Sequence, residues 1–409
     1  MAVYNSRSTK AEEFINHEKI LETLAYAEAH KNDLEMMEQI LEKGRQYKGL
    51  SYKEAMTLLE CEDPDIIQKT FDLGKEIKEH FYGNRIVMFA PLYLSNHCVN
   101  GCVYCPYHGQ NKTIPRKKLT QEEIRKEVIA LQDMGHKRLA IEAGEDPVNN
   151  PIEYILESIR TIYSIHHKNG AIRRVNVNIA ATTVEEYKML KDAGIGTYIL
   201  FQETYGCGPH TISVPRIRPA DDIDPDTFDN GVPDDVFKRI VAVLRIAVPY
   251  TGMIMSTRES AKTRRECLEI GITQISGGSR TSVGGYVDEE RPEDTTQFDV
   301  EDRRTLAEVV DWLIDLGYVP SFCTACYREG RTGDRFMSLL KSGQIANCCQ
   351  PNALMTLKEF LMDYSSEETH KKGDKIIAER MAMIPNEKVR QVCAERLTAI
   401  ENGDRDFRF

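Results

Sequence analysis

The feature that most constrains the fold is a regular alternation of short apolar runs and amphipathic segments from Arg85 onward. The apolar runs have the length of buried strands, and the segments between them have helical spacing of apolar residues. Strands that alternate with helices at this rhythm form a parallel sheet, and this number of units is typical of a TIM-type (βα)8 barrel. We therefore predict an α/β fold with strands in RIVMFAPLYL, KRLAIEAG, RRVNVNIAA, GTYILFQET, HTISVPRI, GMIMST and TQISGG.

The helix boundaries can be read from the sequence as well. Thr120 with Glu123, and Thr183 with Glu186, fit the capping box that begins a helix. Four glycines follow helical patterns where a C-terminal cap is expected: Gly135, Gly194, Gly271 and Gly317. We predict three regions, namely an N-terminal helical region over 1–84, the barrel over 85–318 and a C-terminal cluster-binding helical region over 319–409.

One junction breaks the rhythm of the barrel. The runs GTYILFQETY and HTISVPRI both read as strands, yet only the four residues GCGP separate them. Parallel neighbours need a crossover of roughly a dozen or more residues. The sequence therefore predicts an incomplete barrel of seven strands, with a gap and an exposed strand edge at this junction.

Composition narrows the class of protein. The net charge of -11 argues against a broad nucleic-acid footprint, which needs a basic face. No apolar run is long enough to span a membrane, and the N-terminus lacks the apolar core of a signal peptide, so we expect a cytoplasmic protein without a membrane partner. In a reducing cytosol, clustered cysteines are better interpreted as metal ligands than as disulfides.

The eleven cysteines divide into two clusters and four single residues. Cys98, Cys102 and Cys105 follow the first strand with C-x3-C-x2-C spacing. A [4Fe–4S] cube normally takes four thiolates, so three leave one iron open to chelate the amino and carboxylate groups of S-adenosylmethionine (SAM). The alternative is a zinc site with His97 or His108 as fourth ligand. The single cysteines are expected to be small buried residues: Cys61, Cys207, Cys267 and Cys393.

The second strand ends in Ala143, Gly144 and Glu145. Backbone groups at the C-terminal edge of a barrel strand can pair with an amino-acid moiety. In this position the residues resemble the glycine–glutamate motif that holds the SAM amino group in radical SAM enzymes. Tyr104, next to the last cysteine of the first cluster, is expected to shield the cube.

The second cluster contains Cys323 and Cys326 as C-x2-C, then Cys348 and Cys349. A dithiol turn with a distant thiolate at Cys349 would make another three-cysteine site, here for an auxiliary iron–sulfur cluster. A structural zinc site that uses both Cys348 and Cys349, and a redox C-x-x-C pair, remain alternatives.

Several motifs together resemble one family. They are HCVNGCVYCPYH, HKRLAIEAGEDPVNNPIEY, RRVNVNIAATT, VPRIRPADD, ISGGSRTSVGGY and CTACYREGRTGDRFM with CCQPNALMTLKEF. In this order they resemble the HydG family, radical SAM lyases that mature [FeFe]-hydrogenase. The resemblance implies cleavage of L-tyrosine at Cα–Cβ to p-cresol and dehydroglycine, and conversion of dehydroglycine to carbon monoxide and cyanide for the H-cluster.

The resemblance also implies partners and ligands. Cys98, Cys102 and Cys105 would hold the SAM cluster, and Cys323, Cys326 and Cys349 the auxiliary cluster, which carries a labile iron and cysteine. His210, at the start of a strand, is a candidate ligand of that iron; a strand-end histidine bonded to backbone is the alternative. The expected partners are a reductant such as ferredoxin or flavodoxin and other hydrogenase maturation proteins.

The substrate pocket is expected at the ends of the later strands. Arg258, in MIMSTRES, is the candidate for the tyrosine carboxylate, because a guanidinium grips a carboxylate at two points. Further candidates on neighbouring strand ends are Ser256, Ser279 and Arg280, the last of which could instead form an ordinary salt bridge. Tyr93 and Gln202 could line the pocket.

The chain departs from the family at the short junction. Family members carry there a segment of roughly sixty residues, or two strand–helix units, that includes the fifth strand. Two alternatives to tyrosine cleavage therefore stay open, namely an iron–sulfur maturation scaffold without catalysis and a radical SAM lyase of another aromatic amino acid.

Overall fold

The computed structural model describes residues 16–199, 211–287 and 295–409. All seven predicted strands form, and each pairs in parallel with its neighbours in the order β6-β5-β2-β1-β9-β8-β7. The α/β prediction is therefore confirmed. The strands are β1 (Arg85–Ser95), β2 (Arg138–Ala143), β5 (Arg174–Asn178), β6 (Tyr198–Ile199), β7 (Thr211–Ser213), β8 (Gly252–Met255) and β9 (Gln274–Ser276).

The sheet is open where the sequence predicts a gap. β6 and β7, which are consecutive along the chain, lie at opposite ends of the strand order and do not pair with each other in the described residues. Residues 200–210, which join them, lie outside the described residues. The barrel-like sheet contains these seven strands and an eighth that the sequence did not predict, β10 (Val319–Ser321), which pairs with β1. The sheet does not close between β6 and β7 within the described ranges.

Helices follow most of the strands, with the caps that the sequence predicts. Thr120 and Thr183 each form a complete capping box with the glutamate three residues on. Gly135, Gly194 and Gly317 adopt positive φ after their helices, whereas Gly271 ends its helix in an extended conformation. The helices of the barrel are α6 (Gln121–Asp133), α7 (Ile152–Ser164), α8 (Val184–Asp192), α9 (Asp234–Ala247), α10 (Ala261–Ile270) and α11 (Leu306–Asp315). Two minor elements are a hairpin of β3 (His166–His167) and β4 (Gly170–Ala171), and the 3-10 turn η1 (Pro225–Thr227).

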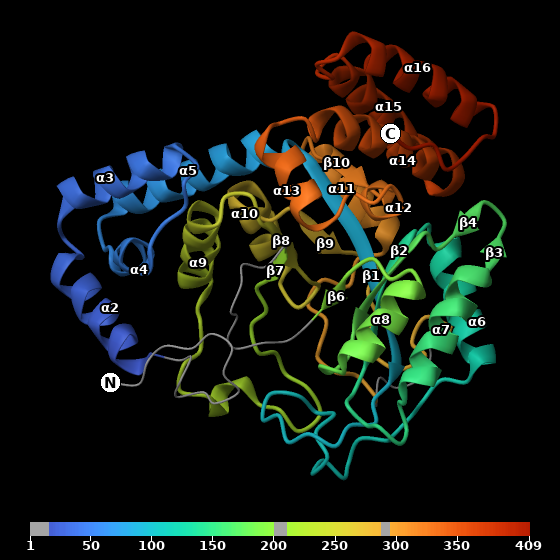
Figure 1. Ribbon diagram of the computed structural model, residues 1–409, viewed down its shortest axis with the longest axis horizontal. Coiled ribbons are helices and arrows are strands. Elements are labelled where there is room, and N and C mark those ends of the chain that lie inside the picture. The colour runs from blue at the N-terminus through green and yellow to red at the C-terminus, as the bar shows by residue number, and fades with distance from the viewer. Residues whose placement is uncertain (1–15, 200–210, 288–294) are drawn as a thin grey trace.

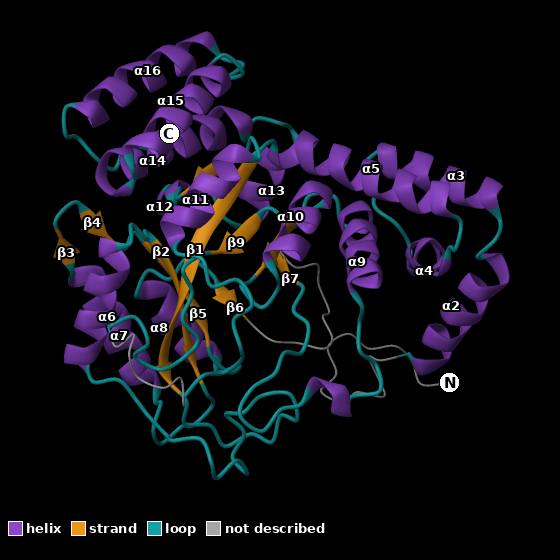
Figure 2. Ribbon diagram, turned by 180° about the vertical axis from the view of Figure 1, so that it is seen from behind, coloured by secondary structure: helices purple, strands orange, loops and turns teal. Residues whose placement is uncertain are grey.

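Helical regions flank the sheet at both ends of the chain. The N-terminal region contains α2 (His17–His30), α3 (Leu34–Arg45), α4 (Tyr52–Glu60) and α5 (Pro64–Tyr82). The C-terminal region begins with a strand, β10 (Val319–Ser321), which pairs with the first residues of β1. It continues with α12 (Ala325–Arg328), α13 (Gly333–Lys341), α14 (Ala346–Tyr364), α15 (Glu367–Met381) and α16 (Glu387–Glu401). Figures 1 and 2 show these C-terminal helices near the start of β1, and the long loops at the opposite end of the sheet.

The alternation of side chains along the strands separates a core from an interior face. On β2, Leu139 and Ile141 are fully buried in the apolar cluster that also contains residues of α6 and α7. The alternate residues of the strand, Arg138, Ala140 and Glu142, project to the other side of the sheet. This face points into the barrel, so the interior carries charged groups at both ends of one strand.

The single cysteines belong to the core, as the sequence predicts. Cys61, Cys267 and Cys393 are fully buried among apolar side chains. The remaining single cysteine, Cys207, lies outside the described residues. In the described part of the chain, no helix has the length and apolar character needed to cross a membrane.

Candidate functional site

The first cysteine cluster lies in the loop at the C-terminal end of β1. Cys98, Cys102 and Cys105 are all partly buried, and none is in a disulfide. The backbone N–H of Cys105 donates to the carbonyl of Cys102 at 3.3 Å, which keeps the last turn of the loop tight. The loop therefore brings three free thiols together at the mouth of the barrel.

The loop is held against the end of β2 by the residues that resemble the SAM-binding motif. Val99 N–H donates to the Glu145 carbonyl at 2.8 Å, and Asn100 donates to the Glu145 carboxylate. Asn150 donates to the carbonyls of both His97 (2.9 Å) and Gly144 (2.8 Å). Ala143, Gly144 and Glu145 thus lie beside the cysteines, where sequence reasoning places them.

Gly144 is required by this close approach. A Cβ on Gly144 would lie 2.4 Å from the His97 carbonyl oxygen and 2.8 Å from the Cβ of Cys98. Both distances are shorter than real Cβ contacts, and the first is to rigid backbone. The absent side chain is therefore what allows the cysteine loop to pack against β2.

The thiol donors fit an iron–sulfur cluster better than a zinc site with His108 as fourth ligand. Both ring nitrogens of His108 are already hydrogen-bonded, Nε2 to Asp222 at 2.7 Å and Nδ1 to Gln110 at 3.3 Å. Among the residues described, no three His, Cys, Asp or Glu side chains converge on a single ion. The thiolates of a cube bind separate irons and need no common point. Burial raises the pKa of the Cys105 thiol.

A group of polar side chains adjoins this loop inside the barrel. The Tyr93 hydroxyl donates to Gln297 Oε1 at 2.8 Å, and Gln297 Nε2 lies 3.7 Å from Cys105 Sγ. The guanidinium of Arg258 stacks on the ring of Phe298, 3.6 Å from its centroid. Burial lowers the pKa of Arg258, while the nearby Tyr93 and Glu142 act in the opposite direction. Arg258 thus lies just after the predicted strand, beside Phe298 and near Tyr93.

The other predicted pocket residues are placed as follows. Ser256 accepts a hydrogen bond from the backbone of Arg258 at 3.3 Å. Ser279 is buried, and its hydroxyl has no hydrogen-bond partner among the described residues. The Arg280 backbone donates to the Tyr286 hydroxyl at 3.2 Å. Tyr104 is 43% exposed at the rim of the cysteine loop. The remaining two predictions, Gln202 and His210, lie outside the described residues.

The second cysteine cluster is assembled from separate elements at the opposite end of the barrel. Cys323 follows β10, Cys326 lies on α12 and Cys349 lies on the first turn of α14. A hydrogen bond from the Cys349 thiol lowers the pKa of Cys326, and the same bond raises that of Cys349. Cys323 lies close enough to both for its charge to influence them. Three thiols therefore lie near one another at the base of the barrel.

Cys348 points to a different neighbour from Cys349. Its sulfur lies 3.8 Å from Nη1 of Arg331, whose backbone N–H donates to the Cys326 carbonyl at 2.6 Å. Arg331 also donates to the carbonyl of Phe409. Cys349 therefore contacts Cys326, whereas Cys348 contacts Arg331.

Arginines from the barrel interior border this second site. Arg138 donates to the carbonyl of Cys323, and the guanidinium of Arg174 stacks 3.4 Å from the centroid of the Tyr327 ring. Burial lowers the pKa of Arg138 to about 9. The base of the interior is thus lined by cations, whereas the mouth carries the carboxyl of Glu142.

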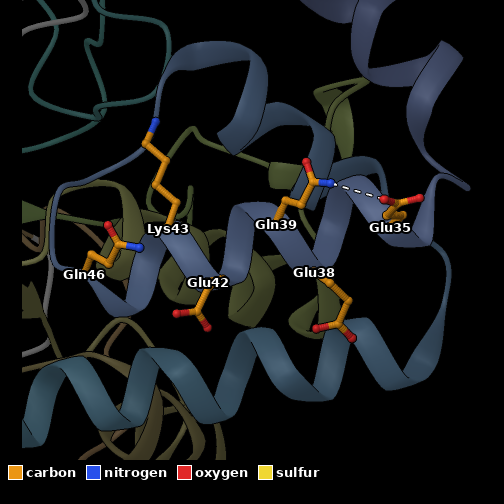
Figure 3. A pocket seen from close by; sticks show the side chains of 6 residues that line it. All are labelled: Glu35, Glu38, Gln39, Glu42, Lys43 and Gln46. Carbon is orange, nitrogen blue, oxygen red and sulfur yellow. Dashed lines mark hydrogen bonds between the residues drawn. The ribbon is translucent and has the colours of Figure 1, made fainter.

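A surface hollow elsewhere has no part in either site. Figure 3 shows it beside α3, lined by Glu35, Glu38, Gln39, Glu42, Lys43 and Gln46. Lys43 pairs with Glu54 at 2.7 Å, and Glu38 pairs with Lys69, so two of its charges are already neutralised. None of the predicted site residues lines it.

Sequence reasoning missed several residues of the two sites. Glu142, Gln297, Arg138 and Arg331 are all near cysteines or Arg258, and none was singled out. Of these, only Glu142 and Arg138 can be recognised from the sequence, because each is a charged residue within an otherwise apolar strand, RLAIEA. Gln297 and Arg331 lie in loops, where a polar residue is unremarkable without the fold.

Comparisons with known proteins agree with this geometry. Residues 92–213 match the family model described as the Radical SAM superfamily, and residues 213–319 match the Biotin and Thiamin Synthesis associated domain. The curated relatives include the 2-iminoacetate synthase of Salmonella typhimurium, 23% identical over 66% of this chain and 86% of that protein. They also include the [FeFe] hydrogenase maturase subunit HydE of Thermotoga maritima, 29% identical over 41% of this chain and 45% of that protein. The chain is a radical SAM protein.

Solved structures define the family within that class. A crystal structure of HydG, a maturase of the [FeFe]-hydrogenase, is 50% identical, with a TM-score of 0.92 over 97% of this chain and 100% of that chain. HydG from Carboxydothermus hydrogenoformans is 34% identical, with a TM-score of 0.78 over 95% of this chain and 100% of that chain. This chain belongs to the HydG family of hydrogenase maturases.

Proposed function

We propose that the protein is a radical SAM lyase that cleaves L-tyrosine at Cα–Cβ to p-cresol and dehydroglycine. Dehydroglycine is then converted to carbon monoxide and cyanide for the [FeFe]-hydrogenase H-cluster. The observation that carries the proposal is the presence of two three-cysteine sites at opposite ends of one barrel, with Arg258 beside the first. The 2-iminoacetate named for the Salmonella relative is another name for dehydroglycine, which supports the same chemistry.

The two ends of the barrel would have different roles. Cys98, Cys102 and Cys105 would hold a [4Fe–4S] cluster, which with bound SAM supplies a 5′-deoxyadenosyl radical on reduction. Gly144 and Glu145 would hold the SAM amino group beside that loop. Arg258 would bind the tyrosine carboxylate in the pocket that Tyr93 and Gln297 border.

The base would handle the second stage. Cys323, Cys326 and Cys349 would hold the auxiliary cluster, with its labile iron and cysteine. Partners would be an electron donor such as ferredoxin or flavodoxin and other maturation proteins. We also propose that the regions 1–84, 85–318 and 319–409 act as the helical, barrel and auxiliary-cluster parts.

A second candidate function is an iron–sulfur scaffold without catalysis. The specific observation that favours it is the unclosed sheet between β6 and β7 in the described residues. Such a gap leaves the contacts to SAM and substrate incomplete on one side.

One assay separates the candidates. The protein is reconstituted with iron and sulfide without oxygen, then given SAM, dithionite and either tyrosine or tryptophan. The proposal expects 5′-deoxyadenosine and p-cresol with tyrosine. Cluster loading without deoxyadenosine above background would instead identify the scaffold, and cleavage of tryptophan alone would identify a lyase of another aromatic amino acid.

A further inference from the structure

Three polar side chains form a row across the mouth of the barrel. Tyr93 on β1 is the register partner of Glu142 on β2, and Glu142 is the partner of Asn178 on β5. Register partners in a sheet project their side chains to the same face. The apolar neighbours Leu92, Ile141 and Val177 are fully buried in the core outside the strands, so the polar row faces the interior.

The carboxyl of Glu142 has hydrogen-bonding capacity that the described residues leave unused. Asn178 donates to its Oε2. No other hydrogen bond or ion pair to this carboxyl occurs in the described part of the chain. Burial raises the pKa of Glu142 to about 8, which is what a carboxyl without a cationic hydrogen-bond partner does in a confined site. A buried carboxyl in a pocket is costly unless a ligand or partner completes its interactions.

The guanidinium of Arg258 likewise lacks a carboxylate partner among the described residues. It stacks on Phe298, and within the described ranges its guanidinium has no carboxylate within 4 Å. Tyr93, the register partner of Glu142, donates to Gln297 at 2.8 Å, and Arg258 stacks on the adjacent Phe298. This chain of contacts brings the two side chains to the same part of the interior, in agreement with the electrostatic effect of each on the pKa of the other. One cation and one carboxyl therefore face the same space without pairing directly.

This pair matches the head group of an α-amino acid, which carries a carboxylate and an ammonium on one carbon. We propose that Glu142 is a specificity-determining residue that binds the ammonium group of the substrate while Arg258 binds its carboxylate. The inference deepens the proposed function and rests on it for the identity of the substrate. Asn178 and Tyr93 flank Glu142 in the row, and Asn178 holds the carboxyl in place.

The test measures binding apart from chemistry. The reconstituted protein with SAM but no reductant cannot turn over, so calorimetry reports the Kd of tyrosine and of 3-(4-hydroxyphenyl)propanoate, which lacks the amino group. Wild-type protein should bind tyrosine roughly 10- to 100-fold more tightly, the range of a hydrogen bond to a charged group. Glu142→Gln should weaken tyrosine by a similar factor and leave the desamino compound nearly unchanged.

Two variants control for structure. Glu127→Gln also removes a buried carboxyl, but Glu127 accepts from the backbone of Tyr286 and Val287 and has no role in the pocket. It should leave the preference for tyrosine intact. Glu142→Asp, which keeps the charge, should restore part of that preference.

Three results would overturn the inference. One is equal binding of tyrosine and the desamino compound by wild-type protein, a comparison that needs no variant to fold. Another is equal weakening of both ligands in Glu142→Gln. The third is loss of discrimination against phenylalanine in that variant, which would place Glu142 at the phenol hydroxyl. Failure of the proposed function has a different signature, because p-cresol would be missing after reduction whatever the binding preference.

Discussion

The two cysteine sites of this protein are built in different ways. At the mouth, Cys98, Cys102 and Cys105 come from one short loop, and their spacing alone brings them together. At the base, Cys323, Cys326 and Cys349 come from a loop and two helices, and Cys349 joins them only because α14 packs beside β10. The cysteines at the mouth therefore belong to one short segment after a strand, whereas those at the base are brought together by tertiary packing.

The electrostatic surroundings differ as well. The mouth adjoins an interior carboxyl, Glu142, whereas the base is bordered by Arg138, Arg174 and Arg331. A thiolate-bound cluster carries negative charge. Nearby arginines stabilise that negative charge, so we expect them to stabilise a cluster at the base. The comparison teaches that one barrel interior presents a carboxyl together with Arg258 to one site, and arginines to the other.

The largest expected effect is at the mouth. Cys105→Ala should abolish formation of 5′-deoxyadenosine and remove about four iron atoms per chain, the content of one cluster. Iron analysis and product chromatography check this. Cys61→Ala, at a fully buried single cysteine, is the matched control and should keep both. Normal deoxyadenosine formation by Cys105→Ala would contradict the ligand assignment.

The next effect separates two adjacent cysteines at the base. Cys349→Ala should lose the auxiliary cluster, because the Cys349 thiol lies within hydrogen-bonding reach of Cys326, while retaining the SAM cluster and deoxyadenosine formation. Cys348→Ala should keep both clusters, because Cys348 contacts Arg331 instead. Iron content and EPR spectra of the two variants provide the measurement. Loss of the auxiliary cluster in Cys348→Ala alone would reverse the assignment.

A smaller effect tests how the mouth loop is held. Gly144→Ala places a Cβ against the His97 carbonyl and Cys98, so the loop must shift. We expect slower SAM cleavage, by about 10-fold or more if a misplacement near 1 Å results, with iron retained. Gly231→Ala is the control, because a Cβ there meets nothing within 4 Å. Unchanged cleavage in Gly144→Ala would show that the close packing is dispensable.

The smallest effect is a pH dependence of stability near the base end of β2. Burial lowers the pKa of His136 to about 3, so the folded protein holds this ring neutral. Its contribution to stability is present above the unfolded-state value near 6.5 and is lost as the pH falls toward 3, because the unfolded chain then binds the extra proton. Urea unfolding from pH 7 to pH 4 should show a steeper fall for the wild type than for His136→Leu. Identical slopes would show that His136 does not contribute to the loss of stability at low pH.

Sequence reasoning recovered much of the fold and the local site. The seven strands, the capping boxes of α6 and α8 and the gap after β6 follow from periodicity, cap residues and connection length, all of which are local properties. The mouth cysteines follow from spacing. The choice of Cys349 over Cys348 came from spacing and family resemblance and remains a prediction, although the two thiols have different neighbours, Cys326 and Arg331.

The contacts that the sequence could not predict depend on strand register and tertiary packing. Nothing in RLAIEA indicates that Glu142 would align with Tyr93 and Asn178, because that row depends on the pairing of three strands distant in sequence. Likewise, Gln297 reaches Cys105 across nearly two hundred residues of chain. Such contacts exist only after the sheet forms.

The central claim is that one barrel holds two distinct iron–sulfur clusters, of which only the mouth cluster binds SAM. EPR spectroscopy of the reconstituted and dithionite-reduced protein, recorded with and without SAM, tests it most directly. We predict two overlapping cluster signals, one of which changes on addition of SAM and disappears in Cys105→Ala, while the other does neither and disappears in Cys349→Ala. A single cluster signal, or two signals that both respond to SAM, would contradict the account.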